Sequence, residues 1–273
     1  MPAAGAVGDG AASALRREIA LVVLSAYTVP QGNEAPYTES TMRRVVVMSD
    51  LHGNLTALKA VVDSLPEHDE VVVAGDLCLD GPDPAGVIDL LRELDWPLLM
   101  GNTDFDIIQA PDDLKRKEAD TVAWTRDQLG AARLRFLANL PFSHRIATGT
   151  GQWVLAVHAN PLNMDEALSP TMTPEELEPY LKGVDAEVLA FGHLHTPYVR
   201  PVGDVVLVDV SSVGHPKDCD LRSAYTVFEW DGARRSISQV RVPYDVERAV
   251  DRMRRCGMPH AEKRIASLLK ASY

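Results

Sequence analysis

Apolar residues in this chain gather in short uninterrupted runs, and several of these runs stop abruptly on an acid, an amide or a histidine. The first, Val45–Met48, is followed closely by Asp50 and His52. Such runs, rich in β-branched residues, are typical of a strand buried on both faces in a parallel sheet. After Gly53 the apolar spacing becomes helical, and we expect a helix over Leu55–Leu65. Asp50 and His52 therefore stand at the end of a strand, where open α/β sheets place their ligand crevice.

The same pattern recurs four more times along the chain. The later runs that end on a possible ligand are Val71–Asp76, Trp96–Asn102, Trp153–His158 and Val188–His195. One such motif is weak evidence, because short motifs have a high false-positive risk. Five strands that each deliver an oxygen or nitrogen ligand at the same end are much more specific, since clusters of His and Asp mark metal sites. Asp50, Asp76 and Asn102 follow one another at intervals of 26 residues, which suits parallel βαβ units.

The remaining pattern predicts alternating helices and strands, followed by a strand-rich half and a helical C-terminus. Helices are expected at about 85–94, 119–129, 131–140, 174–182 (with Thr173 as N-cap), 244–256 and 259–270. Further strands are expected at about 98–100, 144–148, 152–158, 186–191, 197–202, 205–210, 224–230 and 236–242. Gly149-Thr150-Gly151 and Val202-Gly203-Asp204 have the composition of hairpin connections.

The chain divides into three parts by composition. Residues 1–41 are Ala/Gly-rich and polar, and we expect a disordered extension, with Met42 as a natural alternative start. Residues 42–243 are expected to form one domain, which carries a helical insertion at about 105–140. Residues 244–273 are expected to be helices packed on the same domain.

Composition and charge narrow the functional classes. With 273 residues, 46% hydrophobic and 24% charged, the chain resembles an ordinary soluble globular protein with a sizeable core. Its net charge of −12 argues against an extended nucleic acid or an anionic membrane as partner. Its three cysteines have no metal-ligand spacing and suggest reduced thiols in a cytoplasmic protein. The apolar run Ile19–Ala26 is too short to cross a bilayer.

Seven side chains at the strand ends have the chemistry of metal ligands. They are Asp50, His52, Asp76, Asn102, His158, His193 and His195. Zinc usually takes four ligands and other first-row divalent metals up to six, so seven ligands imply two ions that share a carboxylate. Two neighbouring divalent ions suit phosphoryl transfer, and their charge can attract a phosphate to an otherwise acidic protein. The other histidines, His68, His144 and His260, lie in polar segments and are expected to be structural, with His215 ambiguous.

These motifs resemble, in order and identity, those of the calcineurin-like metallophosphoesterase superfamily, and most of all its compact bacterial and archaeal phosphodiesterase-like branch. The resemblance rests on Asp50-Leu51-His52, Gly75-Asp76, Gly101-Asn102-Thr103-Asp104, Val157-His158 and Gly192-His193-Leu194-His195, and it covers about residues 43–245. It implies an α/β (α+β) fold in which two mixed β-sheets pack as a sandwich flanked by helices, with the dinuclear site at the carboxyl ends of the strands. The metals implied are manganese, iron, zinc or nickel.

The resemblance also implies a role for each ligand. One ion would take Asp50, His52, Asp76 and His195, and the other Asp76, Asn102, His158 and His193. The implied activity is that of a phosphodiesterase or nucleotide pyrophosphohydrolase, through in-line attack by a metal-bridging hydroxide. The catalytic residues would be Asp76, Asn102, Asp104 and His158, with Asp104 orienting its neighbours from behind.

One residue departs from the family pattern. Many relatives have a histidine at the position of Thr103, and that histidine is thought to protonate the leaving group. Threonine is no proton donor near neutral pH, so the change favours activated diesters and anhydrides over simple monoesters. Candidate substrate contacts are Asn54, Thr103 and His215, although Asn54 also suits a helix N-cap and His215 a plain turn.

Two other functions stay open. A phosphoprotein or phosphomonoester phosphatase is less favoured because Asp80-Gly81 stands where such enzymes usually carry arginine and glycine. A scaffold without catalysis is disfavoured because all seven ligands are present. The expected partner is a small phosphate ester or nucleotide, and the residues leave the exact substrate, the metal and the oligomeric state open.

Overall fold

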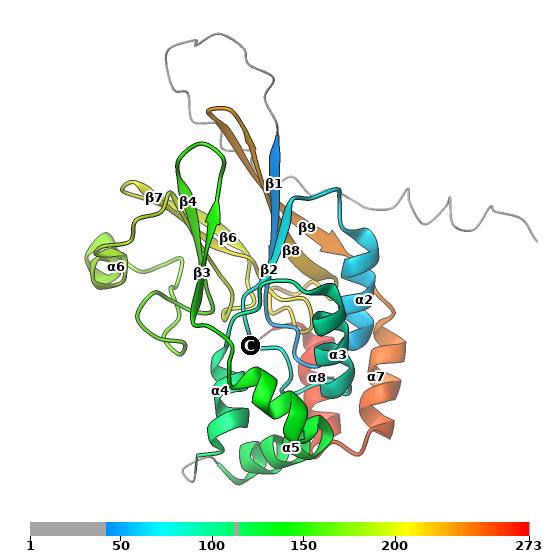
Figure 1. The fold of residues 1–273 in the computed structure, drawn as a ribbon. Coiled ribbons are helices and arrows are strands. Elements are labelled where there is room, and N and C mark those ends of the chain that lie inside the picture. Colours follow the sequence, from blue (N-terminus) through cyan, green and yellow to red (C-terminus); the bar gives the residue numbers. More distant parts are fainter. Residues whose placement is uncertain (1–41, 112–114, 273) are drawn as a thin grey trace, which may run out of the picture.

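The computed structural model describes residues 42–111 and 115–272, where nine strands form two mixed sheets that pack face to face (Figure 1). The first sheet contains β1 (Arg43–Met48), β2 (Glu70–Val73), β8 (Ser223–Asp231) and β9 (Arg234–Val242), in the order β2-β1-β8-β9. The second contains β3 (Ser143–Ala147), β4 (Trp153–Val157), β5 (Val188–Phe191), β6 (Tyr198–Val202) and β7 (Val205–Asp209), in the order β3-β4-β5-β7-β6. The predicted extension over residues 1–41 lies outside the described residues.

Parallel and antiparallel pairs occur in both sheets. β1 pairs with β2 in parallel, as the βαβ spacing predicts, but it pairs with β8 in antiparallel orientation. β4, β5 and β7 are parallel neighbours, and antiparallel β3 and β6 join them at the two edges. Both predicted hairpin connections are confirmed, between β3 and β4 and between β6 and β7. The two-sheet fold class is therefore confirmed.

Strand β1 is buried on both faces, which explains its uninterrupted apolar run. Because side chains alternate across a strand, Val46 and Met48 face the helical layer, whereas Val45 and Val47 face the second sheet. The core between the sheets continues through Phe228 and the inward side chains of β4, β5 and β7. This packing fixes the position of the end of β1, where Asp50 and His52 follow.

Seven helices cover the outer faces and the carboxyl ends of the strands within the described residues. They are α2 (Leu55–Ser64), α3 (Pro84–Leu94), α4 (Asn102–Gln109), α5 (Arg116–Leu137), α6 (Pro174–Leu181), α7 (Val246–Arg255) and α8 (Ala261–Lys270). Helices α2, α3 and α5 share an apolar core with the outer face of the first sheet. Helix α6 covers the second sheet, while α4 and α5 lie beyond the ends of the strands (Figure 1). No helix in these ranges is both long and apolar enough to cross a membrane.

Local signals determine where several helices begin and break. Thr173 caps α6 and forms a capping box with Glu176, as the sequence predicts. The predicted pair of helices within 105–140 appears as α5 with a break at Gly130, whose φ of 64° and ψ of 170° are not helical. Helices α7 and α8 are separated at Gly257 and pack together around Met253. The proposed domain boundaries stay a prediction.

The predicted strand over 98–100 is wrong. Leu98 makes only an isolated parallel bridge to Val73, in which Leu99 donates its N–H to Val73 and Pro97 accepts the N–H of Val73, while Met100 donates its N–H to the carbonyl of Pro141. Pro97 has no N–H to extend the ladder. The chain then enters α4 at Asn102 itself, so Asn102 lies in the first turn of a helix rather than at the end of a strand.

Candidate metal centre

The loops that carry the predicted ligands have strained backbones. Five of the seven ligands adopt left-handed φ angles: Asp50 (57°), His52 (46°), Asp76 (55°), His193 (70°) and His195 (59°). Residues other than glycine rarely adopt this region, and each instance costs about 1–3 kcal/mol. Such strain persists where the surrounding structure imposes it, and it concentrates at functional sites. Here the turns direct these side chains into one space at the carboxyl ends of the strands.

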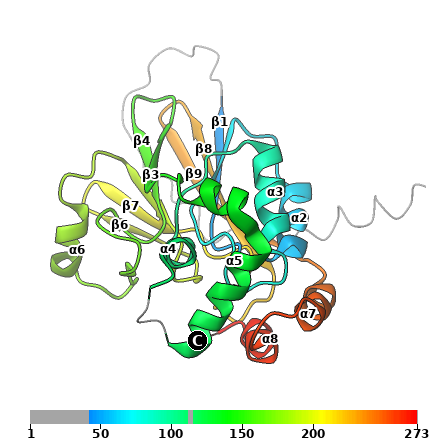
Figure 2. The same cartoon turned by 60° about the horizontal axis from the view of Figure 1, so that its bottom comes forward.

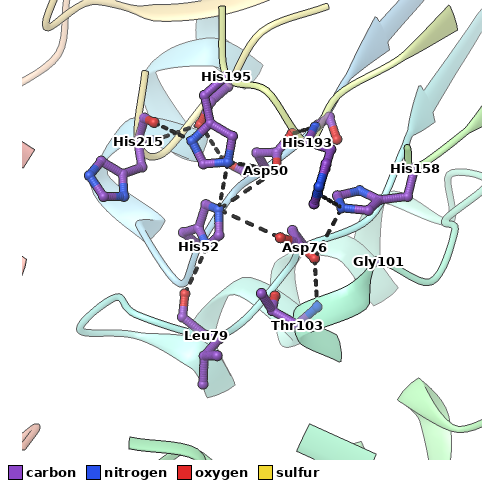
Figure 3. Close-up of polar contacts among 12 residues, drawn as sticks. Asp50, His52, Asp76, Leu79, Gly101, Thr103, His158, His193, His195 and His215 are labelled. Carbon is purple, nitrogen blue, oxygen red and sulfur yellow. Dashed lines mark hydrogen bonds and ion pairs between the residues drawn. The ribbon is translucent and has the colours of Figure 1, made fainter. Parts of the chain in front are cut away.

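Two groups of buried side chains meet in this space (Figure 3). Asp50, His52 and His195 form the first group, and Asp50, Asp76 and His158 form the second, with ligand atoms in each group within 4.8 Å of one another. Asp50 belongs to both groups, and Asp76 lies near a histidine of each: its Oδ2 is 3.7 Å from His52 Nε2, and its Oδ1 is 3.5 Å from His158 Nε2. This is the position expected of a bridging carboxylate.

The two remaining predicted ligands join the second group. Asn102 Oδ1 lies 2.9 Å from His158 Nε2, and His193 Nδ1 lies 3.3 Å from the same nitrogen. The structure therefore brings all seven predicted side chains together. They come from both sheets and from the start of α4.

Every imidazole in the centre donates one ring N–H to a backbone carbonyl. The pairs are His52 Nδ1 with Leu79 (3.0 Å), His158 Nδ1 with Ala74 (2.8 Å), His195 Nδ1 with His215 (2.5 Å) and His193 Nε2 with Asp165 (2.9 Å). A carbonyl oxygen only accepts, so these bonds assign the tautomers. In a neutral imidazole the other nitrogen then carries a lone pair. Histidines that bind metals are held in this way.

The remaining ring nitrogens face one another across the centre. His52 Nε2 and His195 Nε2 are 3.2 Å apart, and His195 Nε2 is 3.0 Å from Asp50 Oδ1. Asp50 Oδ1 is buried and has no hydrogen-bond partner among the described residues. Acceptors crowded in this way repel one another unless a proton or a metal cation lies between them, and a mixed N/O set suits first-row divalent metals. The residues present therefore fit divalent ions at both positions.

The electrostatics of the centre also favour positive charge. Burial by itself would lower the pKa of His52, but the Asp50 carboxylate, 3.7 Å from His52 Nε2, and the charge of Asp76 raise that pKa to about 9. The two carboxylates thus stabilise a proton on this ring, and they would stabilise a metal ion in the same place.

Asp104 supports the centre from behind. Its Oδ1 accepts from the N–H of Leu77 at 3.0 Å, and its Oδ2 accepts from the N–H of Gly101 at 3.1 Å. Burial, followed by the nearby charge of Asp76, raises the pKa of Asp104 to about 7. The structure shows Asp104 bonded to backbone groups that flank two ligands, so it is a positioning residue, in line with the orienting role that the sequence suggests.

The three predicted substrate contacts have structural partners. Asn54 caps α2: its Oδ1 accepts from the N–H of Ala57, and its Nδ2 donates to the carbonyl of Gly214, so the capping alternative is confirmed. Thr103 donates its N–H to Asp76 Oδ1 at 3.0 Å, while its hydroxyl is buried without a partner among the described residues. His215 packs edge-on to His52 and His195, and its Nε2 contacts Ser267 Oγ at 3.1 Å.

Other residues of the centre were missed by the sequence analysis. Ser212 donates its hydroxyl to the carbonyl of Asp50, and Gly192 leaves room for the carboxylate of Asp50. A Cβ added at Gly192 would lie 2.2 Å from Asp50 Oδ2. The position of Gly192 next to His193 could have indicated this close approach from the sequence. Nothing near Ser212 in the sequence indicates its contact with Asp50, which lies 162 positions away.

Comparisons with known proteins agree with this geometry. Residues 43–197 match the family model for calcineurin-like phosphoesterases. A protein of Methanocaldococcus jannaschii, described as uncharacterised protein MJ0912, is 26% identical over 236 residues, which cover 79% of this chain and 93% of the relative.

Two solved structures are similar in fold. A metallophosphoesterase from Sphaerobacter thermophilus has a TM-score of 0.68 at 24% identity, covering 84% of this chain and 99% of the other. Hypothetical protein PH1004 from Pyrococcus horikoshii has a TM-score of 0.73 at 18% identity, covering 84% of this chain and 98% of the other.

Proposed function

Since this chain belongs to the calcineurin-like metallophosphoesterase family, we propose that it hydrolyses phosphodiesters or nucleotide phosphoanhydrides with two divalent metal ions. The observation that carries the proposal is the convergence of four imidazole lone pairs on the carboxylates of Asp50 and Asp76. The general activity of the family, metal-dependent hydrolysis of a phosphoester, is consistent with these buried candidate ligands.

The ligands divide between two positions. Asp50, His52 and His195 would hold one ion, while Asn102, His158 and His193 would hold the other, with Asp76 between them. Divalent ions in such a pair activate a water molecule and neutralise the phosphate oxygens during in-line displacement. The protein contributes by fixing each imidazole through its backbone carbonyl and Asp76 through the N–H of Thr103.

A preference for activated substrates follows from the groups near the centre. The hydroxyl of Thr103 is buried, and the Nε2 of His215 is bonded to Ser267. Neither side chain is placed to protonate a leaving oxygen, so the reaction depends on a leaving group that departs as an anion or carries its own proton. Aryl diesters and phosphoanhydrides meet this requirement better than alkyl monoesters do.

The test compares hydrolysis of bis-p-nitrophenyl phosphate with that of p-nitrophenyl phosphate, first with added Mn²⁺ and then with EDTA. We expect faster cleavage of the diester and complete loss with EDTA. His158→Ala should abolish activity, whereas His144→Ala, on the same hairpin and paired with Glu70, should leave it unchanged. A monoester preference would favour a phosphomonoester or phosphoprotein phosphatase, and inactive protein with two bound ions would favour a scaffold.

A further inference from the structure

The two carbonyls that orient His52 and His195 lie on loops held by the C-terminal helix α8. His52 is oriented by the carbonyl of Leu79, and the next residue, Asp80, forms an ion pair of 2.7 Å with Arg264. His195 is oriented by the carbonyl of His215, and the ring Nε2 of His215 contacts Ser267 Oγ at 3.1 Å. Arg264 and Ser267 lie three positions apart on α8, and therefore on one face of the helix.

The connection continues beyond the end of the helix. The carbonyl of Ala271 accepts the N–H of Cys219, and Ser272 forms an antiparallel bridge with Asp218. The neighbouring Lys217 donates its backbone N–H to the carbonyl of His195 at 3.0 Å. The segment from His215 to Cys219 is thus held between α8 and the loop that carries His195.

The conformation and burial of Asp80 show why its ion pair with Arg264 matters. Its backbone φ is 76°, in the left-handed region, and its side chain is only 14% exposed. A carboxylate with so little contact with water requires a partner of opposite charge, and Arg264 supplies it. The position of Asp80, and with it the neighbouring carbonyl of Leu79, therefore depends on α8.

The position formed by Asn102, His158 and His193 is supported differently. Its two orienting carbonyls belong to Ala74, at the end of β2, and to Asp165, in the loop before α6. Within the described part of the chain, no hydrogen bond or ion pair joins either of these residues to α8. The two metal positions therefore differ in how they depend on the C-terminus.

Helix α8 is itself firmly placed. Ile265 and Leu268 are buried in an apolar cluster with α7 and with Trp124 of α5, and Figure 2 shows α7 and α8 beside each other below the sheets. The helix can therefore resist displacement of the two loops it contacts.

We propose that α8, through Arg264 and Ser267, sets the affinity of the metal position formed by Asp50, His52 and His195, and leaves the other position unaffected. The proposal rests on the metal centre of the proposed function, but it does not depend on which phosphate ester is cleaved. Arg264 and Ser267 are positioning residues, because they act through Asp80 and His215. Loss of such supporting contacts typically weakens metal affinity by about 10–100-fold.

The experiment measures binding of Mn²⁺ by calorimetry without substrate, in two single-position backgrounds. His158→Ala leaves the position that contains His52 and His195, and His52→Ala leaves the other. Arg264→Gln and Ser267→Ala are each added to both backgrounds. We expect binding to weaken by about 10–100-fold in the His158→Ala background and to remain unchanged in the His52→Ala background.

Controls separate positioning from damage to the fold. Lys263→Gln removes a charge from the exposed neighbour of Arg264 and should leave Mn²⁺ affinity unchanged at both metal positions. The conservative variants Arg264→Lys and Ser267→Thr should retain much of the Mn²⁺ affinity that Arg264→Gln and Ser267→Ala lose. Equal weakening in both backgrounds, or no weakening in either, overturns the proposal. Wild-type protein that binds two ions but cleaves no ester would refute the proposed function and leave this binding test decisive.

Discussion

Replacement of Asp104 tests how the centre is held together without touching a metal ligand. The Asp104 carboxylate joins the segment after β2 to the segment before α4 by accepting the N–H groups of Leu77 and Gly101. Leu77 follows Asp76 and Gly101 precedes Asn102, so each bond fixes the backbone beside one ligand. The side chain is completely buried, and water cannot replace it.

The expected loss follows from these two bonds. A buried donor left without a partner costs about 1–3 kcal/mol, so Asp104→Ala, which leaves the N–H groups of Leu77 and Gly101 without their acceptor, should lower the free energy of unfolding by about 2–6 kcal/mol. Asp104→Asn keeps one acceptor oxygen but points an NH₂ group at the other N–H donor. This variant should therefore lose about half as much unfolding free energy as Asp104→Ala. The larger loss is a substantial part of the total of about 5–15 kcal/mol that holds a typical domain together.

The assay is urea unfolding in EDTA at about pH 5, because the raised pKa of Asp104, about 7, makes its contribution to stability decline as the pH rises above about 4; the metal titration is run separately at about pH 8. The titration with Mn²⁺ should show weaker binding by about 10–100-fold for both variants. If Asp104→Ala were as stable as the wild type, or if the asparagine variant lost as much as the alanine variant, the two-bond account of Asp104 would be refuted.

Two further predictions concern close packing and buried charge. Gly192→Ala should lower the free energy of unfolding by about 1–3 kcal/mol and weaken Mn²⁺ binding, because its Cβ would press on Asp50 Oδ2. Gly86→Ala is the matched control, because its Cβ would press closely only on the flexible end of the Leu55 side chain; equal losses of stability in the two variants would contradict a specific role for the contact with Asp50. Burial raises the pKa of Asp209 well above its usual 3.8, so the folded state holds this proton more tightly, and the contribution of Asp209 to stability declines as pH rises above about 4. Asp209→Asn should therefore gain stability relative to the wild type between about pH 5 and pH 8 in urea unfolding, and a difference independent of pH would count against this.

The ligands themselves were predictable because their signals are local. The apolar run of β1 records burial on both faces, and the polar residues that follow it mark the end of a buried strand. The N-cap at Thr173 and the break at Gly130 were also correct, since capping and backbone freedom are properties of a few adjacent residues. For the same reason, all seven proposed ligands could be identified before their distances were known.

What the tertiary structure decided depends on pairs of residues far apart in the chain. The sequence does not say that β1 lies beside β8, about 180 positions later, because apolar strands of similar composition are interchangeable partners until their side chains pack. It also does not show that the pairing of residues 98–100 with β2 would stop at the single bridge of Leu98, or that α4 would begin at Asn102. The tautomers of the four histidines and the contacts of α8 with Asp80 and His215 are likewise invisible to periodicity. Local pattern thus indicated which residues are the candidate ligands, and packing between distant segments determined how they are held.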